Sequence, residues 1–420
     1  MFKAESQAAL VHVSHSQDLT TPPESLERAP DKNQCSFRIA LMLKDRLDSF
    51  VALAHTRLIL PLCVISILGI ATAMRRVWKK RSVGRGPVLA PEKDALEDKK
   101  DTADLGTITP LTDYDYLHAE PRRVYKFQPK FFMTMGLQST DINHILHIDS
   151  DYLERLQARR NVAAIRPEVL ACLPRGLPAV HEFYNYLVHQ WLPGRYPTIF
   201  TLFPERQTLE NTVTGEHLPL TPPADGRQTL EILNRNLDDD VLFMTPRSDN
   251  EEDGLALNAL MWCFPNTSDP RQRLGGSLRE VHQRVPGYKE KLGMSMDRYF
   301  RRLQVGRVVC RTNWAVSIKA SQTESQLTDK DYRGSAPTEI DPAKIYLRCE
   351  LQTLFRLPVS GARVFIIHEY VYPLQQIKDE GLGPAMIQSI DGLKEGNVPA
   401  IWDYKEAPKW AEAVKQFLST

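Results

Sequence analysis

Two stretches of the chain, residues 308–318 and 345–356, alternate between apolar and polar residues, and this alternation predicts β-strands. A third run, residues 363–372, follows the turn sequence PVSG and predicts another strand. Strands joined by a short glycine-containing turn pair antiparallel. A nearly continuous apolar run over 255–264 predicts a fourth strand that is covered on both faces. The pattern therefore predicts an antiparallel sheet of at least four strands.

Other segments show the helical period of 3.6 residues. A single apolar stripe runs along 180–191, formed by Val180, Phe183, Tyr184, Leu187, Val188 and Trp191. Further helices are expected over about 229–238 and 288–303. A shorter one, over 277–285, begins at a capping box of Ser277 and Glu280 and ends before Pro286-Gly287. Helices and antiparallel strands together predict a mixed α/β fold of the α+β kind.

The short helix over 277–285 places a histidine on its apolar side. His282 shares that side with Leu278, Val281 and Val285. One interpretation is a core histidine that hydrogen-bonds within the protein. The other is a metal ligand, and neutral imidazole is a standard axial ligand of haem iron.

One face of the predicted sheet carries polar and charged side chains. They are Arg311, Asn313, Arg348, Glu350 and Gln352. An antiparallel sheet can present such a face to water. Alternatively, these side chains converge on one ligand, with the arginines binding carboxylate groups such as haem propionates. The spacing alone leaves both alternatives open.

Several classes of site find little support in the sequence. The six cysteines form no CxxC or CxxCH motif, so we expect packed thiols and no covalent haem attachment. An HxxH pair, His144 and His147, has no third ligand near it in the sequence. No GxxxxGK[ST], GxGxxG or GxSxG motif is present, and a net charge of +1 gives no reason to expect nucleic-acid binding.

An uncharged stretch precedes the folded part of the chain. Residues 58–74, LILPLCVISILGIATAM, are followed by the basic sequence RRVWKKR. This pattern predicts a transmembrane helix over 58–76 in an intracellular membrane, with the C-terminal part of the chain on the cytosolic side. A buried core helix is the alternative. Around it we expect a disordered leader (1–35), a juxtamembrane segment (36–57), a flexible linker (77–120) and a globular domain (121–420).

Several blocks between residues 120 and 375 point to a known family. They are KFQPKFFMTMGL, IDSDYLERLQARR, LMWCFP, GGSLREVHQRVPGY, MDRYFRRLQVGRVVCRTNWAV and LRCELQTLFRLPVSGARVFIIHEYVYPL. Together they resemble the haem-dependent oxidative N-demethylase alpha-subunit-like family, which has many fungal members. The resemblance implies a PAS-like fold that binds haem b non-covalently. It also implies O2-dependent demethylation of a small amine, with electrons from a separate reductase.

The resemblance further assigns expected roles to individual residues. His282 is the expected iron ligand, Arg311 or Arg348 would meet a haem propionate, and Glu350 would pair with a cationic amine. Asn313, Gln352 and Met135 would line the haem or the substrate. The expected function is therefore that of a haem-dependent monooxygenase, and the alternative is a non-catalytic PAS-like sensor of haem or a small ligand.

Overall fold

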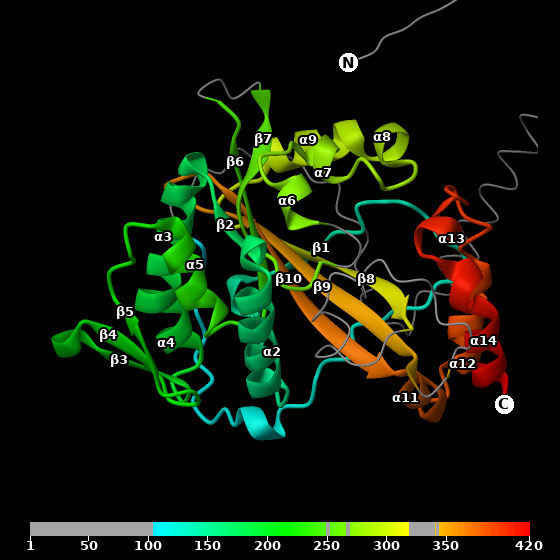
Figure 1. Ribbon diagram of the computed structural model, residues 1–420, viewed down its shortest axis with the longest axis horizontal. Coiled ribbons are helices and arrows are strands. Elements are labelled where there is room, and N and C mark those ends of the chain that lie inside the picture. Colours follow the sequence, from blue (N-terminus) through cyan, green and yellow to red (C-terminus); the bar gives the residue numbers. More distant parts are fainter. Residues whose placement is uncertain (1–103, 249–252, 266–268, 319–340, 342–343) are drawn as a thin grey trace, which may run out of the picture. The chain divides into compact units, whose positions relative to one another are not determined.

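The computed structural model describes residues 104–248, 253–265, 269–318, 341 and 344–420 (Figure 1). The predicted leader, juxtamembrane and transmembrane segments lie outside these residues. Within the described part, no helix has both the length and the hydropathy that a membrane span requires. The end of the predicted linker packs on the globular part, since Leu105 is buried and Leu111 N donates to Arg195 O.

Seven antiparallel strands form the main sheet, in the order β1-β8-β9-β10-β6-β7-β2. Their bounds are β1 Gln138–Thr140, β2 Leu170–Cys172, β6 Asp240–Pro246, β7 Leu255–Met261, β8 Val308–Ser317, β9 Tyr346–Arg356 and β10 Arg363–Pro373. A smaller sheet contains β3 Phe200–Phe203, β4 Thr208–Asn211 and β5 Glu216–Pro219. The predicted antiparallel sheet and the mixed α+β class are thus confirmed.

Helices pack around the sheet, and Figure 1 shows α7, α8 and α9 grouped together, with α12, α13 and α14 near the C-terminus. The α-helices are α2 Tyr152–Ile165, α3 Leu177–Tyr186, α4 Leu192–Arg195, α5 Gly226–Asn234, α6 Pro270–Arg273, α7 Leu278–Val281, α8 Tyr288–Lys291, α9 Gly293–Arg302, α11 Leu374–Asp379, α12 Gly383–Asp391, α13 Ile401–Tyr404 and α14 Ala407–Ser419. A π-helix, Leu187–Trp191, connects α3 to α4. Short 3-10 turns span Tyr116–His118, Ile142–His144, Pro167–Val169, Pro174–Gly176 and Pro204–Arg206.

The helix predicted over 180–191 is confirmed, and all six residues of its apolar stripe are fully buried. Three other predicted helices differ in extent. The helix α5 begins at Gly226 because the Asp225 side chain caps it, and it ends at Asn234 rather than near 238. The helix predicted over 288–303 is divided into α8 and α9, with Leu292 between them at φ −120°. The helix predicted over 277–285 is shorter in the structure, where it is α7, although its capping box is present.

The two faces of the main sheet differ as the alternation predicts. On the apolar face, Leu347, Cys349 and Phe355 of β9 are buried in the hydrophobic core. The strand register places Asn313, Glu350 and Glu369 side by side on the opposite, polar face. In the described part of the chain Cys172, Cys263, Cys310 and Cys349 are free thiols, as predicted.

Candidate functional site

The short helix α7 is fixed at both ends by hydrogen bonds. Ser277 Oγ accepts from the Glu280 backbone N (3.3 Å), and Glu280 Oε2 accepts from the Ser277 backbone N (2.7 Å). At the other end, the Arg273 guanidinium donates to Glu280 O (2.9 Å). A bridge between Ser277 and Ala256 joins the start of α7 to β7. The residue after α7, His282, is therefore held relative to the sheet.

One nitrogen of His282 is occupied and the other is available. Nδ1 lies 2.8 Å from Leu278 O, and because a carbonyl only accepts, Nδ1 carries the proton and Nε2 the lone pair. The ring stacks on Tyr288, with centroids 4.7 Å apart and planes 8° apart. Among the described residues, Nε2 has no hydrogen-bond partner. A fixed imidazole with one bare nitrogen is what a metal ligand needs.

The environment of His282 favours the neutral imidazole. Burial lowers its pKa below the usual value, as do the positive charges of Arg311 and Arg273, while the hydrogen bond to Leu278 O raises the pKa by less than burial lowers it. The ring is nevertheless only half-buried.

Arg311 of β8 contributes a cation close to His282. Its side chain is half-buried, burial lowers its pKa, and its Nε is buried without a hydrogen-bond partner in the described part of the chain. A buried guanidinium donor left bare is costly unless an anion meets it. Arg311 is therefore suited to bind a ligand carboxylate. Its charge acts on the imidazole of His282, so these two predicted residues lie near each other.

The other predicted residues of the polar face form one network. Glu350 Oε2 accepts from Gln352 Nε2 (2.8 Å) and from Asn313 Nδ2 (3.4 Å). Arg348 lies 3.7 Å from Glu350 Oε1 and pairs with Glu369 Oε2 at 2.6 Å. Arg348 and Glu369 are both buried, so this part of the face is not simply a water-facing surface.

Two residues of this network were not predicted from the sequence. Glu369 could have been found, because the PVSG hairpin sets it opposite Glu350. Lys405 could not, since it reaches the sheet from the C-cap of α13. Its Nζ donates to Trp314 O, lies 3.4 Å from Asn313 Oδ1 and sits 4.9 Å from the centre of the Trp314 ring, while burial lowers its pKa to about 8.

Met135 occupies a different setting from the rest of the predicted site. It is half-buried against the hydrophobic core, in a segment that runs beside the α12–α13 connection. That segment is held there by Phe131 N donating to Gly392 O and by Met133 N donating to Asn397 Oδ1. Among the described residues, no hydrogen bond joins Met135 to His282.

Comparison with known families matches most of this domain. A model described as HODM_asu-like, "Haem-dependent oxidative N-demethylase, alpha subunit-like", covers residues 136–415, which is more than half of the chain. The matched region contains His282 and the entire polar network, and it begins directly after Met135.

Proposed function

Because the chain belongs to the haem-dependent oxidative N-demethylase, alpha subunit-like family, we propose that it binds haem b non-covalently and oxidises a small amine. The observation that carries this proposal is the state of His282. Its Nδ1 proton is donated to Leu278 O, so Nε2 is free to bind iron, and Arg311 beside it offers an unpaired donor. The absence of a CxxCH motif from the sequence supports non-covalent binding.

The residues of the site fit a haem and a cationic substrate. His282 would ligate the iron, and Arg311 would meet a propionate in fork geometry. Haem supplies the O2 chemistry when bound. Glu350, held by Gln352 and Asn313, would bind the ammonium group of an amine and orient it. Arg348, 3.7 Å from Glu350 Oε1, would hold Glu350 in place.

Further features extend the proposal beyond the family assignment. We take the sheet and its helices to be a PAS-like fold. Electrons would come from a separate reductase subunit, because the sequence contains no dinucleotide fingerprint. Residues 58–74 would anchor the protein in an intracellular membrane with the haem domain in the cytosol.

The absorption spectrum of the haem-loaded full chain tests the role of His282. We expect a Soret band that is lost or strongly shifted in His282→Ala, because the axial ligand is removed. His282→Gly should regain a ligated spectrum when imidazole is added. The control is His217→Ala, which changes an exposed histidine on β5. An unchanged spectrum in His282→Ala would contradict the assignment.

Turnover distinguishes the demethylase from a haem-binding sensor. The wild-type chain with a chemical reductant and O2 should release formaldehyde from a small secondary N-methyl amine. A chain that binds haem through His282 but releases no formaldehyde from any such amine would favour the sensor.

A further inference from the structure

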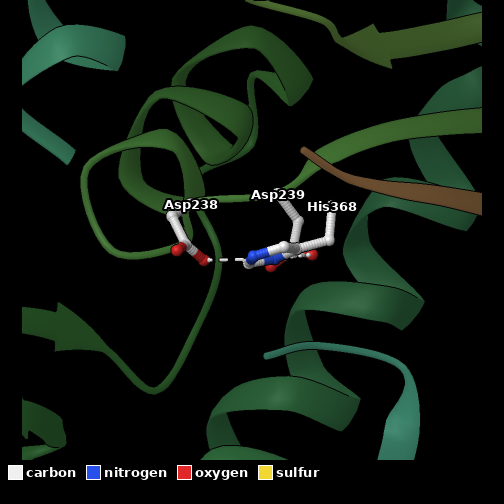
Figure 2. A group of neighbouring side chains, drawn as sticks. All are labelled: Asp238, Asp239 and His368. Carbon is white, nitrogen blue, oxygen red and sulfur yellow. Dashed lines mark hydrogen bonds and ion pairs between the residues drawn. The ribbon is translucent and has the colours of Figure 1, made fainter. Parts of the chain in front are cut away.

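A second cluster of titratable side chains lies on the other face of the sheet from the polar network. His368 of β10 pairs in register with Leu351, while the next residue, Glu369, belongs to the polar face. Asp238 and Asp239 lie in the connection between α5 and β6. Figure 2 shows these three side chains pointing toward one another. All three are at most 3% exposed.

The three side chains are spaced as ligands of one ion would be. His368 Nδ1 lies 3.0 Å from Asp239 Oδ1 and 3.9 Å from Asp238 Oδ1. One ligand atom from each residue can be chosen so that all three lie within 4.8 Å of one another. Ligands about 2.0–2.2 Å from a shared metal lie roughly 3 to 4 Å apart, so only small shifts would admit an ion.

The cluster has more negative than positive charge. Arg155 is shared between Asp238 Oδ2 (2.8 Å) and Asp149 Oδ1 (2.6 Å), and Arg159 pairs with Asp240 (2.8 Å). Neither arginine forms an ion pair with Asp239, whose carboxylate lies 3.0 Å from His368 Nδ1. Neighbouring buried carboxylates that outnumber the nearby cations favour the binding of a further cation.

The far side of the imidazole gives an independent observation. His368 Nε2 and Asp149 Oδ2 are buried 3.9 Å apart, and neither has a hydrogen-bond partner among the described residues. If Nδ1 carries the only proton, two lone pairs face each other. If Nε2 carries it, the proton points to Asp149, and Nδ1 becomes a bare nitrogen between two carboxylates. That second state is a metal-binding triad with a carboxylate behind its histidine.

We propose that Asp238, Asp239 and Nδ1 of His368 bind one divalent transition-metal ion, with Asp149 holding the proton on Nε2. One imidazole and two carboxylates suit ions from Mn2+ to Zn2+. The ion tethers the α5–β6 connection to β10 and is separate from the haem iron, which His282 would hold on the other side of the sheet. The HxxH pair noted in the sequence lies outside this group of three ligands. His144 pairs with Asp141 (2.9 Å), and the His147 ring packs edge-on against the His368 ring, with centroids 5.7 Å apart.

Metal content of the full chain tests the site with Zn2+ and Mn2+ as the probes. After dialysis against a chelator, we expect the wild type to take up one equivalent of either ion and to melt at least about 3 °C higher with excess ion. Asp239→Asn and His368→Gln should each weaken binding at least about 10-fold. His282→Ala, which removes the haem ligand, and Asp141→Asn, an exposed carboxylate, should bind like the wild type.

The contrary results are equally specific. A wild type that retains neither ion, with an unchanged melting temperature, would show that a protonated His368 or a water satisfies the cluster. Equal uptake by Asp239→Asn or His368→Gln would place the ion elsewhere. If those variants do not fold, the metal stoichiometry of the wild type and the change in its melting temperature with added ion still test the proposal.

Discussion

At the scale of single residues, the direction of one hydrogen bond determines what each buried histidine can do. Nδ1 of His282 can only donate to a carbonyl, so its free nitrogen is fixed as Nε2. Nδ1 of His368 faces carboxylates instead, and either tautomer leaves a bare nitrogen next to an acid. The same residue type therefore suits the proposed iron ligand on one face of the sheet and the proposed second metal site on the other.

Lys405 should make the free energy of unfolding depend on pH, and one substitution can test this. Its pKa is about 8 in the folded chain and 10.5 ordinarily, so the folded state binds fewer protons between these values. The free energy of unfolding should therefore rise with pH above 8, with a slope contribution below about 1.4 kcal/mol per pH unit. Lys405→Met should lack this contribution in urea unfolding measured from pH 8 to 9.5.

The matched control for Lys405 is a lysine nearby that stays in solvent. Lys409 is mostly accessible and pairs with Glu406, so Lys409→Met should keep the slope of the wild type. Identical slopes for the wild type and Lys405→Met would mean that Lys405 keeps its ordinary pKa, against the contacts seen here.

At the scale of elements, α7 depends on its cap because it has only one turn. Ser277→Ala removes the side-chain acceptor for Glu280 N and should cost about 1 kcal/mol of stability. Because His282 follows α7 directly, we also expect haem to dissociate up to about 5-fold more readily. Haem titration of the full chain measures this effect.

A second helix cap provides the control for Ser277→Ala, because its loss should lower stability without changing haem affinity. Asp225 caps α5 by accepting from Arg227 N and Gln228 N, far from His282 in the sequence. Asp225→Ala should cost a similar amount of stability and leave haem affinity unchanged. A loss of haem affinity as large as in Ser277→Ala would mean that general destabilisation, not the position of His282, is responsible.

The elements that the sequence predicted well are the periodic ones. The strands β8 and β9 show alternation over ten or more residues, and the helical stripe over 180–191 shows the 3.6-residue period, so the predictions matched within a few positions. Breaks such as Leu292 were missed, because helical periodicity continues across them. Within the site, His282 and Arg311 stood out by their place in a pattern. Lys405 and the Asp238–Asp239–His368 triad did not, because contacts between distant parts of the chain create them.

At the scale of the whole molecule, the main sheet separates two kinds of site. Its polar face carries Arg311 and the Glu350 network, and its other face carries His368. Because side chains alternate along a strand, adjacent residues of β10, His368 and Glu369, serve opposite faces. One strand can therefore support a substrate site and a metal site without direct contact between them.

The whole chain is also where the proposed membrane anchor can be tested. Residues 58–74 carry no charge, and an arginine at the centre of a span costs about 2.5–3.5 kcal/mol. The double variant Ile65→Arg, Ile67→Arg should therefore release the full chain from membranes that retain the wild type after carbonate extraction. An arginine in the leader, Ser16→Arg, is the control and should not. Asn266-Thr267-Ser268 is a glycosylation sequon, and it should stay unglycosylated if the C-terminal domain lies in the cytosol. Wild-type chain found wholly in the soluble fraction would mean that residues 58–74 do not anchor it.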